Sequence, residues 1–264
     1  MPEFTAQDVK ALRDLTGAGM MDCKKALEAN DGDIEKAVKW LREQGITKSA
    51  ARTDRENSQG AVAIAANGPV AALVELKCET DFTAKSEGFL NVANDLAAAV
   101  LEQGDGAIDA MKDAIDDIKL TTKENIEVGK VARLEAADGN VLDTYLHIQA
   151  GRGVNGVLVE LAGGTKEQAH NVALTIAFTK PRYLTSDEVP ADLIEVERAS
   201  FETQTRNEGK PEQAIPKIVE GRVKAWVADQ VLLEQKLQPE EKQAVKDALG
   251  DASVVRFAQA VIGA

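Results

Sequence analysis

An abrupt change from apolar to polar residues marks one stretch near the middle of the first half of the chain. It begins as a continuous apolar run, Val70 to Leu76, with the length and β-branched content of a buried strand. Polarity switches at Glu79, and helical periodicity resumes at Phe89. Loops carried by rigid elements concentrate binding groups. The strand-to-helix loop predicted here holds Thr80, Asp81, Phe82 and Thr83.

Phe82 is a large aromatic residue placed between an acid and hydroxyl groups. In one interpretation it folds back onto its own core as a loop anchor. In the other it is a wedge, whose ring displaces a side chain of a partner while Asp81 perturbs the partner's polar site. The loop alone favours the anchor.

An internal repeat changes that balance. Val74-Glu75-Leu76 recurs as Val159-Glu160-Leu161, each within a strand, a turn, a second strand and a helix. Two similar halves sharing one core are therefore predicted. The second copy passes from strand to helix through a short turn with Thr165 and Gln168 as a capping box. The unit thus forms without the longer first loop, whose extra length favours function and the wedge.

Residues 1–46 are predicted to form three short helices. Thr5 and Asp8 make a capping box at the start of the first. Its apolar face is expected to hold Val9, Leu12 and Leu15.

A glycine-containing break, Thr16–Gly19, separates the first two of these helices. Asp22 is expected to cap the second helix and Gly45 to stop the third. Met20 and Met21 follow the break, and two interpretations stay open. They form an adaptable apolar contact for a partner, or they plug the small three-helix core.

The first core half carries the clearest periodicities. Gly60–Leu76 is predicted to be a hairpin around Asn67-Gly68. Helices through Phe89–Val100 and Ile108–Ile118 follow, and then a strand within Asn125–Ala137.

Later in the chain, Pro190 opens a helix, Gly209-Lys210-Pro211 reverses the direction, and a return helix follows. The fold class is therefore α+β. The predicted units are a three-helix domain (1–46), a linker (47–59), the first core half (60–140), the second core half (141–188), an antiparallel helical hairpin (189–230) and a return to the second half (231–264).

Composition narrows the class of partner. The net charge is −13 over 264 residues, which argues against extensive contact with nucleic-acid phosphates. No apolar run approaches a membrane span, and the first residues lack the layout of a secretion signal. Two cysteines, Cys23 and Cys78, are expected to be reduced thiols of a cytoplasmic protein. A protein partner is favoured.

Several apparent motifs carry no chemistry. Gly151–Gly156 matches the dinucleotide fingerprint, but a strand follows it where the motif needs a helix. We expect a flexible hairpin connection instead. His147 and His170 lack neighbours at metal-ligand spacing, and His170 is expected on a helix surface. No catalytic residue, metal or cofactor is predicted.

Three segments resemble the bacterial elongation factor Ts family, in matching order and over essentially the whole chain. They are Leu12–Leu27 with the following GDIEKAVKWLRE, the stretch VELKCETDFTAK, and Gly209–Trp226. The resemblance implies that the N-terminal helices form a ubiquitin-associated-like domain and that the hairpin is a projecting coiled coil. Thr83 replaces the usual valine of the family, and Lys77 replaces a small residue. Since the chain ends at Ala264, we expect it to lack a further C-terminal module of some members.

The resemblance implies a guanine-nucleotide exchange factor for elongation factor Tu, in its GDP-bound and nucleotide-free states. Phe82 would wedge into the partner's GTPase domain while Asp81 disturbs the magnesium and phosphate site. His147 matches a partner-contacting position, although a half-buried sheet residue is the alternative. A homodimer within a heterotetramer is left open. The rival function is a ubiquitin-like-binding adaptor, suggested by the three-helix domain alone.

Overall fold

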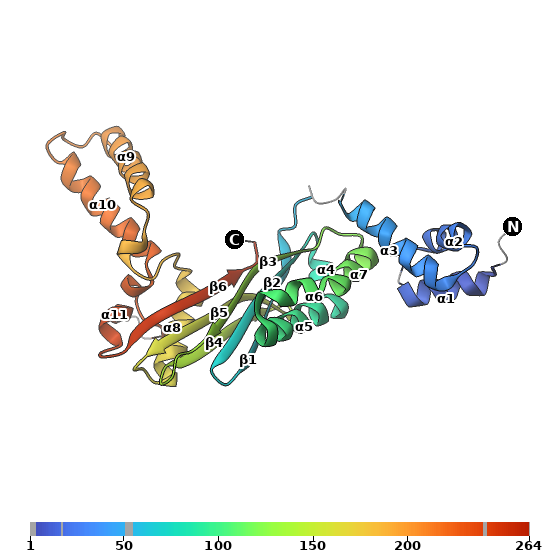
Figure 1. The fold of residues 1–264 in the computed structure, drawn as a ribbon. Helices are drawn as coiled ribbons and strands as arrows, with labels where there is room; N and C mark the ends of the chain where they lie inside the picture. Colours follow the sequence, from blue (N-terminus) through green and yellow to red (C-terminus); the bar gives the residue numbers. More distant parts are fainter. Residues whose placement is uncertain (1–3, 17, 51–54, 240–241, 264) are drawn as a thin grey trace.

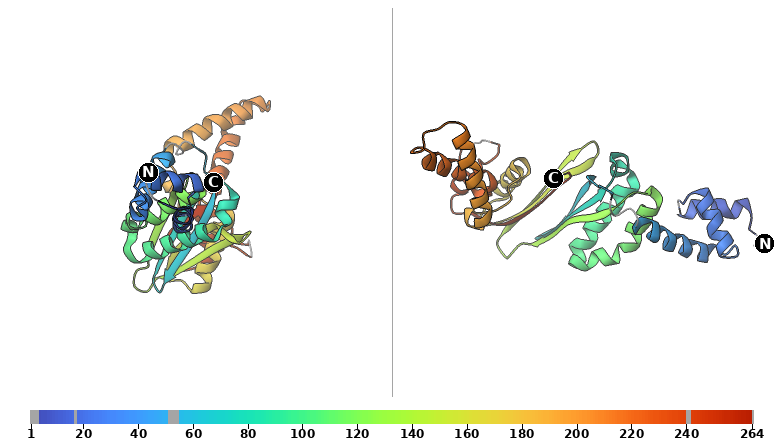
Figure 2. Two further views of the ribbon diagram at one scale, coloured as in Figure 1. Left: turned by 90° about the vertical axis from the view of Figure 1, so that its right-hand side faces the viewer. Right: turned by 90° about the horizontal axis from the view of Figure 1, so that it is seen from above.

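A computed structural model describes residues 4–16, 18–50, 55–239 and 242–263. It has a central core with three N-terminal helices at one end and a helical hairpin at the other (Figures 1 and 2). The core contains two antiparallel three-stranded sheets, ordered β1-β2-β3 and β4-β5-β6. The predicted α+β class is confirmed.

The two core halves follow one another along the chain. The first half consists of β1 (Gln59–Asn67), β2 (Val70–Cys78), α4 (Asp81–Lys85), α5 (Glu87–Gln103), the 3-10 turn η1 (Gly104–Gly106), α6 (Ala107–Ala110), α7 (Lys112–Thr122) and β3 (Glu127–Glu135). The second consists of β4 (Val141–Gln149), β5 (Arg152–Ala162), α8 (Lys166–Thr179), η2 (Ser186–Glu188), α9 (Ala191–Asn207), α10 (Ile215–Gln230), η3 (Leu232–Glu234), α11 (Val245–Ala248) and β6 (Ser253–Val261).

The predicted repeat is confirmed as two hairpins, β1–β2 and β4–β5, each followed by helices. Gly68 has φ +58° in the first turn, a conformation that suits glycine. Thr165 and Gln168 form the predicted capping box at the start of α8. In β2, alternate residues face α5, which makes the first half's core with Phe89 and Leu96 at its centre.

The two sheets lie face to face, and a third apolar cluster, which includes Leu73 and Leu158, fills the space between them. Glycines in β5 allow the close approach. A Cβ atom at Gly153 would meet the backbone carbonyl of Val62, and one at Gly156 would meet the Val62 side chain. The prediction of a flexible connection over Gly151–Gly156 is therefore wrong, because only its first residue lies in the turn and the rest is strand.

The N-terminal domain packs its three helices, α1 (Ala6–Thr16), α2 (Met20–Ala29) and α3 (Ile34–Ala50), around Leu12 and Leu27. Thr5 and Asp8 form the predicted capping box. The predicted stop at Gly45 is wrong, since α3 runs on to Ala50. One glycine costs a helix only about 1 kcal/mol, which is too little to end it.

Two further N-terminal predictions are corrected. Asp22 is not the cap of α2, because the helix begins at Met20 with Gly19 as its N-cap. The carboxylate lies instead in the first turn, where the helix dipole favours negative charge. Leu15 is 68% exposed and lines a groove against α7, so the domain's core closes without it.

The helical hairpin is confirmed as α9 and α10, which pack through Val219, Val223 and Phe201. After it the chain returns to complete the second sheet with β6, a strand that the apolar pattern did not predict. Within the described residues, no helix is both long and apolar enough to span a membrane.

Candidate partner-binding surface

The segment predicted as a loop is a single helical turn. Thr80 is the N-cap of α4, and its hydroxyl accepts a hydrogen bond from the Thr83 amide. Ser86 ends α4 and starts α5, where its hydroxyl accepts from the Phe89 amide. The prediction of an irregular loop is thus corrected, because two caps six residues apart leave room for one turn of helix.

Phe82 lies on the solvent side of this turn. Its exposed fraction is 86%. By contrast, Phe89, which lies in the next helix, α5, is completely buried in the core. An exposed ring contributes nothing to its own core, so the loop-anchor interpretation is wrong. The protein presents an aromatic side chain that it does not use for folding.

Glu124 fixes the turn from the other side. Within the described chain its carboxylate accepts hydrogen bonds from the amides of Glu79 and Thr80, at 3.0 and 3.1 Å. It also accepts from the hydroxyls of Thr80 and Thr83, at 2.6 and 2.7 Å. Hydrogen bonds to a charged acceptor are stronger than neutral ones. The turn under Phe82 is therefore held in one position.

A second carboxylate, that of Glu79, makes the reciprocal hydrogen bond to the segment of Glu124. Glu79 accepts a hydrogen bond from the Asn125 amide at 2.6 Å, so each of two neighbouring segments binds the backbone of the other. Below them, the buried Cys78 thiol donates to the Thr80 carbonyl at 3.2 Å. Burial raises the pKa of this thiol to about 12, which keeps it protonated and unreactive.

Asp81 is partly exposed beside Phe82. Its carboxylate accepts a hydrogen bond from the Lys85 ammonium at 2.6 Å, one helical turn away. This hydrogen bond holds the pKa of Asp81 below its ordinary value. The carboxylate is therefore ionised at neutral pH and paired with Lys85.

Met20 and Met21 are 50% and 65% exposed at the start of α2, so they do not plug the N-terminal core. A Cβ atom at Gly19 would lie 3.5 Å from the Lys123 ammonium. Lys123 directly precedes Glu124 in the sequence. The methionines and Phe82 are thus carried by segments that meet at the end of α7.

His147 is exposed on β4, which excludes its half-buried alternative. The Tyr145 hydroxyl lies 3.2 Å from His147 Nδ1, and both line a cleft of about 630 Å³ together with Phe178 and Arg152. Arg152 donates to the Gly60 carbonyl at 2.7 Å. After Lys85, its charge also lowers the pKa of Asp81, so this cleft lies within electrostatic reach of α4.

The other histidine lies on the outer face of α8, as predicted. His170 Nδ1 is 2.9 Å from an Asp143 carboxylate oxygen. No group of three or more metal-ligating side chains occurs in the part of the chain that the structure describes.

Comparison with known proteins identifies the family. The model of "Elongation factor TS" matches residues 79–264, which is more than half of the chain. This chain belongs to the elongation factor Ts family. The model of "Elongation factor Ts, mitochondrial, N-terminal" matches residues 3–48.

Individual members of the elongation factor Ts family support the same assignment. The chain is 44% identical to elongation factor Ts of Mycobacterium ulcerans (strain Agy99), over 96% of this chain and 95% of the relative. It is 44% identical to that of Acidothermus cellulolyticus, over 100% and 99%, and to that of Nocardioides sp. (strain ATCC BAA-499 / JS614), over 100% of both. Membership in this family implies a nucleotide exchange factor of translation elongation.

The family also accounts for the three N-terminal helices, since they match its own N-terminal model. The three helices therefore no longer argue for a ubiquitin-like-binding adaptor.

No sequence pattern pointed to the residues that hold the turn of Phe82 in place. Glu124 and Asn125 lie more than 40 positions from Thr80 and Glu79, at the junction of α7 and β3. An acid at such a junction has no local pattern, and its role is visible only when the strands pair. Arg152 was likewise hidden inside a glycine-rich motif.

Proposed function

We propose that this chain promotes GDP release from elongation factor Tu by inserting α4 next to the partner's magnesium and phosphate site. The observation that carries this proposal is the contrast at Phe82. Its ring is 86% exposed, while the backbone beneath it is held by the Glu124 carboxylate. A rigid support loses little conformational entropy when an exposed ring enters a partner.

Each residue of the turn has a role in this proposal. Phe82 wedges between side chains of the GTPase domain. Asp81 exchanges Lys85 for polar groups around the magnesium ion, which weakens the hold on the metal. Thr80 and Thr83 position the turn through Glu124 and make the platform from which Phe82 and Asp81 act.

Exchange follows from differential affinity. A protein that binds the nucleotide-free partner more tightly than the GDP-bound form lowers the partner's affinity for GDP by the same factor. The chain needs no catalytic residue, metal or cofactor of its own for this. It enters and leaves with each cycle and is not consumed.

The wedge needs support from a wider surface. Burying one phenylalanine contributes about 1.5–3 kcal/mol, which corresponds to about a ten- to hundredfold effect on rate. Met20 and Met21 offer an adaptable apolar contact on one side of α4. The cleft with His147 and Phe178 offers an aromatic one on the second half.

The test is stopped-flow release of a fluorescent GDP analogue from elongation factor Tu. Substoichiometric amounts of the chain are expected to accelerate release of the whole nucleotide pool, because one molecule serves many partners. An unchanged release rate at saturating concentrations of the chain would refute the proposal. A rate that rises but is unaffected by Phe82→Ala would refute the wedge and leave the exchange activity standing.

A further inference from the structure

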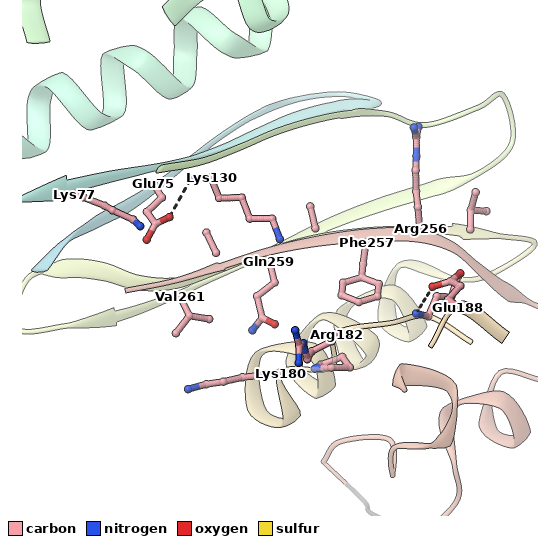
Figure 3. A pocket seen from close by; sticks show the side chains of 15 residues that line it. Glu75, Lys77, Lys130, Lys180, Arg182, Glu188, Arg256, Phe257, Gln259 and Val261 are labelled. Atoms are coloured by element: carbon pink, nitrogen blue, oxygen red, sulfur yellow. Dashed lines mark hydrogen bonds between the residues drawn. The ribbon is translucent and has the colours of Figure 1, made fainter. Parts of the chain in front are cut away.

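A second cleft, of about 600 Å³, runs along the outer edge of β6 (Figure 3). Residues Val255 to Val261 of β6 form one wall. This strand is the last in the order β4-β5-β6, so its far side faces no further strand of its sheet. No residue of α4 lines this cleft, which shares Lys180 and Val261 with the cleft that holds His147 and Phe178.

The backbone of β6 is an open template along this cleft. The Ile262 amide donates to the Val154 carbonyl of β5. Because hydrogen-bonded pairs alternate along an antiparallel ladder, Phe257, Gln259 and Val261 direct their backbone groups to the open side. Within the described residues, these outward N–H and C=O groups have no hydrogen-bond partner.

Cationic side chains flank this edge on both sides. Figure 3 shows Lys77 and Lys130 projecting from the first sheet on one side of β6, with Lys180 and Arg182 on the other. In the part of the chain that the structure describes, none of these four side chains forms an ion pair or hydrogen bond. This is a concentration of free positive charge on a chain of net charge −13.

The remaining charged groups of the cleft are already engaged. Arg256 binds the Glu160 carboxylate at 2.7 Å. Glu75 accepts from the Lys130 amide at 2.9 Å, and Glu188 accepts from the Leu184 amide at 2.8 Å. The two carboxylates are held by backbone amides and keep their negative charge, so the four cations that are unpaired within the described chain, Lys77, Lys130, Lys180 and Arg182, leave the lining net positive.

We propose that the open edge of β6 binds an acidic, extended segment of a partner protein as an added antiparallel or parallel strand. Side chains of a strand alternate between its two faces. Acidic side chains on one face of the added strand meet Lys77 and Lys130, and those on the other face meet Lys180 and Arg182. Its backbone satisfies the outward groups of Phe257, Gln259 and Val261.

The open edge favours a peptide over a nucleic acid. The outward carbonyls of β6 need hydrogen-bond donors at the regular spacing of a strand. A peptide in an extended conformation supplies them, because every second residue directs its N–H to the same neighbouring strand. A phosphodiester chain offers charged acceptors without that ladder of donors. Positive charges beside an edge strand also discourage pairing between identical copies, and the same charges attract an acidic strand.

The test uses the full chain and a fluorescein-labelled peptide that repeats Glu-Glu-Val-Val, which places glutamates on both faces of a strand and is long enough to cover Val255–Val261. Fluorescence anisotropy is expected to show binding that weakens about tenfold when Lys130→Gln and Arg182→Gln are combined. The matched control combines Lys217→Gln and Lys224→Gln, which remove the same charge from exposed positions of α10. This control is expected to bind as the unchanged chain does.

A backbone readout separates strand addition from charge attraction. Methylating alternate peptide nitrogens keeps the charge and is expected to abolish binding. Hydrogen exchange at Phe257, Gln259 and Val261 is expected to slow on binding, while the paired Ile262 amide does not change. Circular dichroism of each variant confirms that it is folded.

Three results would overturn the proposal. Equal binding of the methylated peptide would show attraction without strand pairing. Tighter binding of an oligouridylate than of the peptide would assign the cleft to nucleic acid. Absence of peptide binding by the folded chain would show that the cationic side chains beside β6 only prevent other strands from pairing with it.

Discussion

The Thr83 hydroxyl donates to the Glu124 carboxylate at 2.7 Å, joining the turn that carries Phe82 to the end of α7. Thr83 is buried, with an exposed fraction of 8%. The hydroxyl of Thr83 is therefore used in the fold. The position makes a polar contact here that a valine side chain lacks.

Thr83→Val is expected to lower the free energy of unfolding by about 1 kcal/mol, the usual net value of one hydrogen bond. Glu124 keeps its three donors from Glu79 and Thr80, so GDP exchange is expected to continue at nearly the same rate. Urea unfolding and stopped-flow release measure the two quantities. Thr83→Ser keeps the hydroxyl and is the control, expected to lie closer to the unchanged chain in stability.

Glu124→Ala is expected to loosen the turn. It removes the acceptor of all four hydrogen bonds, so we expect stability to fall by about 2–3 kcal/mol and the exchange rate to fall about tenfold. Hydrogen exchange at the Glu79 and Thr80 amides should become faster. Glu102→Ala, at the exposed end of α5, is the control and is expected to change stability by less than about 0.5 kcal/mol. Unchanged amide protection in Glu124→Ala would contradict the account.

Two phenylalanines near each other in sequence are expected to give opposite results. Phe82→Ala should slow exchange by about ten- to hundredfold and leave the melting temperature nearly unchanged, because the ring is exposed. Phe89→Ala should lower the free energy of unfolding by about 3–5 kcal/mol, since its ring is completely buried. A large loss of stability in Phe82→Ala with normal exchange would reverse both assignments.

The pair formed by Asp81 and Lys85 predicts a pH effect. The hydrogen bond from Lys85 lowers the pKa of Asp81 from 3.8. The contact therefore contributes to stability above that pH and is lost as the pH falls through the lowered pKa. Carbon-13 NMR titration of the carboxyl group measures the value directly. In Lys85→Gln the pKa of Asp81 is expected to rise toward 3.8, and an unchanged titration would exclude Lys85 as the main cause.

Two glycine-to-alanine variants test the contact between the sheets. Gly153→Ala places a methyl group against the Val62 backbone carbonyl, and we expect a loss of about 3 kcal/mol in the free energy of unfolding. Gly106→Ala is the control, because open space surrounds the new methyl group there. Chemical denaturation compares the two. Equal free energies of unfolding for both variants would show that the two sheets can move apart at Gly153 without loss of stability.

Local patterns predicted the elements whose ends are set by neighbouring residues. The capping boxes at Thr5 and Thr165, the hairpin turn at Gly68 and the repeat of Val74-Glu75-Leu76 each depend on a few adjacent side chains. Those features were confirmed. The boundaries of the predicted segments stay predictions, although α3 continues across residue 46.

Contacts between distant residues could not be predicted in this way. Glu124 lies beside Thr80 because β3, which follows it, pairs with β2, which precedes Thr80. Gly153 is strand because the first sheet lies against it, and the same letters in isolation suggest a loop. The exposure of Phe82 depends on where α4 lies on the surface of the core, and the periodicity of the sequence carries no information on that position.

The placement of β6 also governs when the molecule can become complete. Val261 pairs with Asn155, more than 100 positions earlier, and the whole hairpin of α9 and α10 lies between them. The first sheet uses strands that are all translated by Glu135, so it is able to form while the rest of the chain is still on the ribosome. The second sheet has to wait as a two-stranded ribbon until Val261 has been translated. A factor that serves polypeptide elongation thus acquires its own final strand among the last steps of its elongation.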